Sequence, residues 1–202
     1  MGRIYYLFGK SSCGKDSIYQ ELLKDRELGL KGLVLYTTRP MRDGEIDGVT
    51  YHFTDEEGFQ RLSKEGRVIE SRTYETVHGV WRYFTAKDEA LDLDGSDYLA
   101  TGSLGAFLAT RAYFGKEKVV PIYIEVDDGI RLSRALEREL RPENRRFKEM
   151  CRRFLADDED YTEEKLAEAG IEKRFVNDVF FDCLEEIAEY IRRKRAADGY
   201  QG

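Results

Sequence analysis

The feature that most constrains this chain is a glycine-rich loop at residues 9–17, which follows a β-prone segment without a break. Residues 3–8, Arg-Ile-Tyr-Tyr-Leu-Phe, predict a buried strand that ends where the loop begins. Gly9, Gly14 and Lys15 stand at the spacing G-x-x-x-x-G-K. Apolar residues then recur at helical spacing, which predicts a helix over residues 15–26. A strand, a loop and a helix in this order indicate a phosphate-binding loop.

The chemistry of such a loop explains its spacing. Glycine permits backbone dihedrals that turn successive N–H groups toward one point, and the helix directs its positive end at the same place. We expect ATP to be bound by the whole loop: Gly9, Lys10, Ser11, Ser12, Cys13, Gly14, Lys15, Asp16 and Ser17. Asp16 stands where a Ser or Thr usually binds magnesium, so Ser17 is the hydroxyl expected to contact Mg²⁺.

Composition narrows the class of protein. A chain of 202 residues suits one domain, and its net charge of −7 makes nucleic acid an unexpected partner. No apolar run approaches the ~18 residues of a membrane helix, and the first residues lack a secretory signal pattern, so we expect no membrane partner and a cytoplasmic location. Cys13, Cys151 and Cys183 fit neither a disulfide framework nor a zinc site, and Cys13 is expected to be a small loop filler.

Strands and helices are predicted to alternate along the rest of the chain. Predicted strands cover residues 32–36, 50–53, 67–74, 81–85, 97–100, 119–125 and 175–176. Predicted helices cover residues 55–65, 104–113, 129–140, 143–157, 163–169 and 182–196, with Asp55 as an N-cap of the first. This alternation indicates an α/β fold, with a parallel sheet between helices, and the short strands over 50–85 indicate a small insertion beyond one edge.

A second informative run lies at residues 36–53. Arg39 and Arg42 are two guanidinium groups three residues apart, with Tyr51 downstream. Each arginine can form bidentate, charge-assisted hydrogen bonds, so the trio suits a terminal phosphate or another dianion. Composition alone is equally compatible with a solvated, charged loop.

This run resembles the substrate loop of guanylate kinases, whose pattern is T-T-R-x-x-R-x-G-E-x-D/N-G-x-x-Y-x-F. The matching residues here are Thr37, Thr38, Arg39, Arg42, Gly44, Glu45, Asp47, Gly48, Tyr51 and Phe53. The resemblance implies a three-layer P-loop NTPase fold with a small insertion that binds the nucleoside monophosphate (NMP) and a helical lid. It places the core at 1–36, 90–138 and 156–198, the NMP-binding region at 37–89 and the lid at 139–155.

The resemblance continues into the insertion. Residues 68–70 resemble the family's F-I-E, which implies that Glu70 contacts the guanine base. Residues 81–85 resemble a later Y-Y-G-T/S element, which implies that Tyr83 contacts phosphate and Thr85 the base. This second match is looser, because the intervening segment is longer here and Phe84 replaces glycine.

The later segments extend the resemblance. Arg141 and Arg153 resemble the two lid arginines that close on the transferring phosphoryl group, which implies a catalytic role beside Lys15. Residues 175–178 resemble the V-x-N-D segment that borders adenine, which implies that Asn177 contributes to ATP binding.

Two positions depart from the family pattern. The serine that precedes T-T-R and touches guanine is replaced by Leu35 or Tyr36, depending on the count. The strand after the insertion, which ends in an acid in the family, ends here in Thr101 and Gly102. Asp94 or Asp97 is a candidate to replace this missing acid. Residues 157–160, which are all acidic, are expected to form a solvated turn rather than a cation site.

Together these resemblances imply transfer of the ATP γ-phosphate, with Mg²⁺, to GMP or dGMP. An ionised phosphate acceptor needs positioning and positive charge rather than a general base, and we expect residues 50–85 and 141–153 to close over the substrates. One alternative is a related kinase for another nucleoside monophosphate or for ribose bisphosphate, whose kinases share the Gly-Lys-Asp-Ser loop variant. Another is a non-catalytic binding module, against which the intact loop argues. A monomer or a homodimer is expected.

Overall fold

A computed structural model describes residues 2–42, 44–76, 79–87, 91–141, 146–197 and 199 of the chain. Its central sheet has five strands in the order β2-β7-β1-β8-β9, and every pairing is parallel. The strands are β1 (Ile4–Phe8), β2 (Lys31–Gly32), β7 (Tyr98–Gly102), β8 (Val119–Glu125) and β9 (Arg174–Val176).

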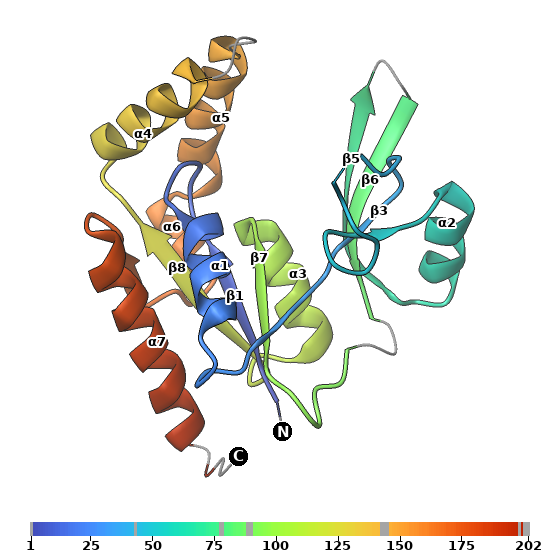
Figure 1. The fold of residues 1–202 in the computed structure, drawn as a ribbon, viewed down its shortest axis with the longest axis horizontal. Coiled ribbons are helices and arrows are strands. Elements are labelled where there is room, and N and C mark those ends of the chain that lie inside the picture. The colour runs from blue at the N-terminus through green and yellow to red at the C-terminus, as the bar shows by residue number, and fades with distance from the viewer. Residues whose placement is uncertain are drawn as a thin grey trace.

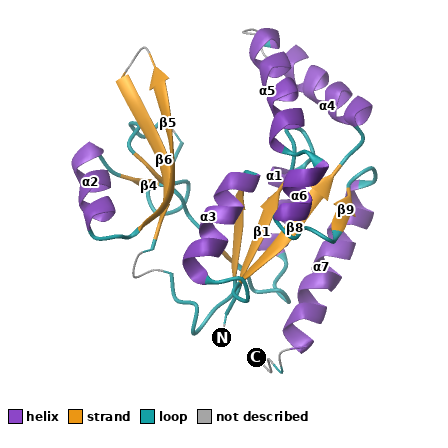
Figure 2. Ribbon diagram, turned by 180° about the vertical axis from the view of Figure 1, so that it is seen from behind, coloured by secondary structure: helices purple, strands orange, loops and turns teal. Residues whose placement is uncertain are grey.

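Strand β1 lies at the centre of this sheet and is buried on both faces. Tyr5 and Leu7 pack with α1 (Lys15–Lys24) and α7 (Phe180–Ala197), whereas Ile4, Tyr6 and Phe8 pack with α3 (Leu104–Phe114) and α6 (Glu163–Glu168). Figure 1 shows the first pair of helices in front of the sheet, and Figure 2 shows the second pair from behind. The predicted α/β fold with helices on both faces is confirmed.

A second sheet lies to one side of the core (Figure 1). Its strands run in the order β4-β3-β6-β5 and are β3 (Tyr36–Thr37), β4 (His52–Phe53), β5 (Val68–Thr76) and β6 (Gly79–Ala86). Phe84 packs against Phe59 and Leu62 of α2 (Glu56–Lys64) on one face. The predicted N-cap is confirmed, because the Asp55 carboxylate accepts a hydrogen bond from the Gly58 N–H at 2.7 Å.

The prediction of one strand over residues 32–36 is wrong. The segment is divided between β2, which pairs with β7 in the core sheet, and β3, which pairs with β6 in the second sheet. Residues 33–35 cross from one sheet to the other. A run of β-prone residues predicts an extended backbone, but it does not reveal which partner strand each end will meet.

Two further helices, α4 (Asp128–Leu140) and α5 (Phe147–Asp160), extend beyond the carboxyl ends of the core strands (Figure 1). They lie beside the glycine-rich loop that follows β1. In the described part of the chain, no helix is long and apolar enough to cross a membrane.

Candidate active site

The loop after β1 has the backbone geometry of a phosphate nest. Gly14 has a φ of 88° and Ser12 a φ of 63°, so both residues lie in the left-handed region. A Cβ at Gly14 would lie 2.4 Å from Asn177 Nδ2, and a Cβ at Gly9 would lie 2.4 Å from the Ile124 carbonyl oxygen. Both glycines are therefore required by space, and Gly14 also by its backbone conformation.

Helix α1 begins directly at this loop with its first N–H groups open to a ligand. Gly14 is the N-cap and provides no side-chain hydrogen bond to the first turn. A helix N-terminus of this kind attracts an anion. Lys15 lines the adjoining cleft, and none of the described acidic side chains forms an ion pair with its ammonium group.

The loop is held from behind by a group of hydrogen-bonded residues around the buried Arg131 and Asp157, here called the loop clasp: Ser11, Asp128, Arg131 and Asp157. The Arg131 side chain is fully buried and donates to the Ser11 carbonyl at 3.1 Å, to Asp157 at 3.2 Å and to Asp128 at 2.6 Å. Asp157 also accepts the Ser11 backbone N–H at 2.8 Å. The clasp therefore joins the loop to both α4 and α5.

The loop clasp corrects one expectation from the sequence in part. Residues 157–160 form the last turn of α5, in which Asp158, Glu159 and Asp160 are exposed as expected, whereas Asp157 is buried against the loop. Asp158 forms an ion pair with Lys10 at 2.8 Å. Arg131 was missed, because one arginine in an amphipathic, charge-rich helix carries no signal of its burial.

Asn177 and Cys13 support the loop from within. Asn177 is buried and its Nδ2 donates to the Cys13 carbonyl at 2.7 Å. Its Oδ1 is buried without a hydrogen-bond partner among the described residues. Cys13 lies in the core, and burial raises the pKa of its thiol, which fits the loop-filler interpretation better than a reactive thiol.

A cleft of about 940 Å³ lies between the loop, the β5–β6 hairpin and α5. The loop contributes Lys15 and Asp16 to its wall, and the carboxyl end of β7 contributes Thr101 and Gly102. Ser17 is exposed on α1 and is not among the residues that line the cleft. Asp16 is thus better placed than the expected Ser17 to meet a metal carried by a nucleotide.

Three of the expected phosphate-binding residues meet in the insertion, where Tyr51 and Tyr83 line the cleft and Arg39 is buried behind them. Arg39 Nε donates to the Tyr83 hydroxyl at 3.1 Å, and its guanidinium carbon lies 5.2 Å from the centre of the Tyr51 ring. Tyr51 and Tyr83 line the cleft with their ring centres 5.7 Å apart. Arg39 itself is only 4% exposed, because Glu45 accepts hydrogen bonds from both of its terminal nitrogens.

Arg42 is outside this group. Its side chain is exposed and does not line the cleft, although its backbone N–H donates to Glu45 at 2.7 Å. The hydrogen bonds from Arg39 lower the pKa of Glu45 to about 2, so this carboxylate stays ionised and keeps the segment around residues 39–45 folded back on itself.

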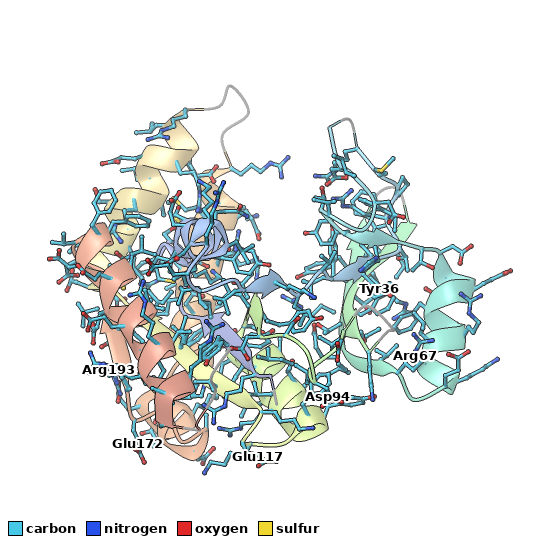
Figure 3. All side chains as sticks on the ribbon, turned by 60° about the horizontal axis from the view of Figure 1, so that its bottom comes forward. Tyr36, Arg67, Asp94, Glu117, Glu172 and Arg193 are labelled. Carbon is cyan, nitrogen blue, oxygen red and sulfur yellow. The ribbon has the colours of Figure 1, made fainter. Side chains whose placement is uncertain are left out.

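The two expected base-reading residues lie side by side. Glu70 and Thr85 are paired across β5 and β6, and the Thr85 hydroxyl donates to Glu70 Oε1 at 2.9 Å. Neither residue lines the cleft, whereas Arg72 does, with its Nε 3.5 Å from Glu70 Oε2. Arg67, which immediately precedes β5, lies beside α2 (Figure 3), and its Nε donates to the Lys87 carbonyl.

The helical side of the cleft carries more arginines than the sequence indicated. Arg153 lines the cleft as expected, together with Arg146 and Arg152. Arg141 caps the carboxyl end of α4, is exposed and is not among the lining residues. The doublet formed by Arg152 and Arg153 is visible in the sequence, but helical geometry alone does not reveal that both face the cleft. Residues 142–145 lie outside the described part of the chain.

The sequence of this chain is similar to those of known guanylate kinases. The family model described as guanylate kinase matches residues 1–98. A guanylate kinase of Wolbachia pipientis is 29% identical over 96% of this chain and 91% of its own length. The chain is thus similar in sequence to guanylate kinases, most strongly over its first 98 residues. A guanylate kinase of Chromohalobacter salexigens is 39% identical over 82 residues, which span 40% of this chain but only 38% of that relative.

The fold has a counterpart among solved structures. The crystal structure of guanylate kinase from Anaplasma phagocytophilum matches 96% of this chain and 86% of its own chain, with a TM-score of 0.59 and 22% sequence identity. Likeness at this level of identity establishes the arrangement of helices and strands.

At Gly102, one of the two positions near which the family pattern has an acid, the structure leaves little room for a side chain. A Cβ at Gly102 would lie 2.4 Å from the Tyr6 hydroxyl, so the tyrosine occupies the space that a side chain at this position would need. Asp97 does not substitute for the acid. It lies before the amino end of β7, where it accepts hydrogen bonds from the Arg3 N–H at 2.7 Å and Arg195 at 2.6 Å. Asp94 lies in the turn before the same end (Figure 3).

A magnesium ion bound with a nucleotide fits the remaining residues. Among the described residues, no group of three or more His, Cys, Asp or Glu side chains forms a metal cage. Magnesium needs only one or two protein carboxylates when phosphates and water supply the other ligands. Asp16 and Asp160 both line the cleft and are the carboxylates available for this purpose, since Asp157 is occupied by the loop clasp.

Proposed function

We propose that this protein transfers the γ-phosphoryl group of ATP to GMP or dGMP. The observation that carries the proposal is the single cleft in which Lys15 of the phosphate loop faces the Tyr51 and Tyr83 pair of the insertion. One wall suits the phosphates of a donor nucleotide, and the opposite wall suits the phosphate of an acceptor. Such an arrangement favours direct transfer between two phosphorylated ligands.

The donor side would hold ATP without movement of the backbone. The N–H groups of the loop and of the first turn of α1 would bind phosphate oxygens, and Lys15 would neutralise the charge that develops on the γ-phosphate. Asp16, the loop carboxylate that lines the cleft, would help to hold a magnesium ion brought with the nucleotide, and the ion would neutralise phosphate charge. Asn177 would act through the Cys13 carbonyl as a support of the loop.

The acceptor side would hold the phosphate of GMP between Arg39, Tyr51 and Tyr83. Tyr51 and Tyr83 would meet the phosphate first, because Arg39 lies behind them with its guanidinium bound to Glu45 and would have to exchange that partner for the phosphate. Glu70 and Thr85 would contact the base. No general base is required, because a phosphate acceptor is already ionised at neutral pH.

Arginines from the helical side would complete the charge around the transferring group. Arg146, Arg152 and Arg153 line the cleft and would approach that group when α5 and the hairpin move together. The role expected of Arg141 requires such a movement, since this side chain lies outside the cleft wall. A cytoplasmic location and a monomeric or homodimeric state remain predictions from the sequence.

The test is a coupled assay of ADP formation from ATP with GMP, dGMP, AMP, IMP and ribose 1,5-bisphosphate as separate acceptors. We expect turnover with GMP and dGMP that exceeds turnover with the other acceptors. Turnover of another acceptor without GMP would replace the proposal with a related kinase. If the protein binds GMP but transfers phosphate to none of these acceptors, it is a binding module instead.

A further inference from the structure

Arg72 stands out on the acceptor face because the resemblance to the family assigns it no role. Three cross-strand pairs form the face of the hairpin that turns toward the core: Glu70 with Thr85, Arg72 with Tyr83, and Tyr74 with Trp81. The opposite face carries Phe84, which packs against α2. Arg72 thus lies between the expected base-reading pair and the expected phosphate-binding tyrosine.

The Arg72 side chain is partly engaged by the protein and partly open to the cleft. Its Nε is buried, forms an ion pair with Glu70 Oε2 at 3.5 Å and has no hydrogen-bond partner among the described residues. The side chain as a whole is 36% exposed and lines the cleft. A ligand in the cleft would therefore meet the exposed part of the guanidinium rather than Nε, and a guanidinium offers only donors, so it suits a ligand that brings an acceptor atom.

Glu70 and Arg72 both lie within electrostatic reach of the Tyr6 hydroxyl. The pKa of Tyr6 is raised mainly by burial and further by the Glu70 carboxylate, whereas Arg72 opposes that effect. The Tyr6 hydroxyl lies against Gly102, which lines the cleft at the end of β7. Arg72 lines the same cleft, and Glu70 lies behind it.

A guanine base presents three neighbouring groups along one edge: the N2 amino donor, the N1–H donor and the O6 acceptor. A complementary surface offers two acceptor positions followed by a donor. The Glu70 carboxylate retains acceptor capacity after it binds Thr85, since its two oxygens can accept about four hydrogen bonds. Arg72 supplies the adjoining donor. Adenine reverses the pattern at N1 and at position 6, where it would oppose a carboxylate with an acceptor and a guanidinium with a donor.

We propose that Arg72 is a specificity-determining residue that donates a hydrogen bond to the 6-oxo group of a purine nucleotide whose N1 and N2 groups contact Glu70. The assignment rests on the proposed function, because it takes GMP as the acceptor. Leu35 strengthens it: this apolar residue lines the cleft at one of the two positions where the family pattern has a guanine-binding serine, so the 6-oxo group needs a donor from elsewhere.

The experiment compares Arg72→Ala, Arg72→Lys and Glu70→Gln with GMP, IMP and AMP. IMP keeps the 6-oxo group of GMP and lacks the N2 amino group, whereas AMP lacks both. Binding is followed by the fluorescence of Trp81, the single tryptophan of the chain, which lines the cleft, and turnover by ADP formation. Arg61→Ala, an exposed arginine of α2 in the same insertion, is the matched control and should change neither measurement.

For Arg72→Ala we expect the affinity for GMP and for IMP to fall alike, by roughly tenfold, with little change for AMP. The preference for GMP over AMP then decreases while the preference for GMP over IMP is kept. Arg72→Lys should restore part of the loss. Glu70→Gln should instead reduce the preference for GMP over IMP.

Two results would overturn the inference. Equal losses for GMP, IMP and AMP would mean that Arg72 contacts the phosphate or supports the hairpin. A loss in Arg72→Ala that follows the pattern of Glu70→Gln would mean that Arg72 only orients Glu70. GMP binding with the expected discrimination but no turnover would refute the proposed function and leave this inference standing. Absence of GMP binding in the unaltered protein would refute both.

Discussion

The phosphate loop and the acceptor face use charged residues in opposite ways. At the loop, the charges are buried behind the binding surface, where Arg131 and Asp157 fasten Ser11 to two helices. At the acceptor face, Arg72 and the ring pair of Tyr51 and Tyr83 stand in the cleft wall itself. The loop is therefore held in its binding conformation before a nucleotide arrives, whereas the acceptor face keeps its polar groups where a ligand can displace their present partners.

A physical need underlies this difference. A loop of small residues has few side chains with which to hold its own backbone, and the positive φ angle of Ser12 adds conformational strain that other contacts must offset. The β5–β6 hairpin is already fixed by its ladder of backbone hydrogen bonds. Its side chains are therefore not needed to hold the backbone and can contact a ligand. Three substitutions test this difference between the loop and the acceptor face.

The largest effect is expected for Arg131→Ala. Removal of the guanidinium leaves the buried Asp157 carboxylate without a compensating charge, which should lower the free energy of unfolding by roughly 3–5 kcal/mol. Urea unfolding measures this loss, and ATP affinity should fall with it. Arg193→Ala is the control: its side chain is 74% exposed beside Glu189, and the expected loss is below about 1 kcal/mol. Equal losses in the two variants would show that the clasp does not hold the loop.

Lys15→Ala should separate catalysis from stability. We expect turnover to fall by roughly a hundredfold to a thousandfold, because a charge aimed at the transferring phosphate is lost. The urea midpoint should stay unchanged, since the ammonium group forms no ion pair with a described residue. Lys24→Ala, which removes an exposed partner of Glu21, should leave both quantities near those of the unaltered protein. Unchanged ATP binding and turnover in Lys15→Ala would contradict the assignment of the loop.

The smallest effect is expected at Glu45, on the acceptor side. Its pKa is lowered from 4.5 to about 2 by the hydrogen bonds from Arg39, so ionised Glu45 favours the folded state. This contribution is complete above pH 4.5 and is lost progressively as the pH falls toward 2. The difference in stability between the unaltered protein and Glu45→Gln should therefore be constant at neutral pH and shrink below pH 4.5. A difference that persists undiminished at pH 2 would show that the carboxylate charge has no part in it.

Much of the framework was predictable because it depends on neighbours in the sequence. Strand β1, the loop and helix α1 follow from a β-prone run, two glycines and apolar residues at helical spacing. The carboxylate of Asp55 identified the start of α2 for the same reason. Arg39, Tyr51 and Tyr83 were named from motif positions, and the structure brings these three together.

What the sequence determined by itself was thus the local backbone: where the phosphate nest forms, which segments are helical and which are extended. Only the tertiary structure decided which charges meet. Arg131 reaches Ser11 and Asp157 across long separations in the chain. The Tyr6 hydroxyl fills the space that a side chain at Gly102 would need. Residues 32–36 were divided between two sheets for the same reason. Backbone geometry depends on adjacent residues, whereas the partner of a buried charge depends on which elements pack together, and no local pattern records that choice.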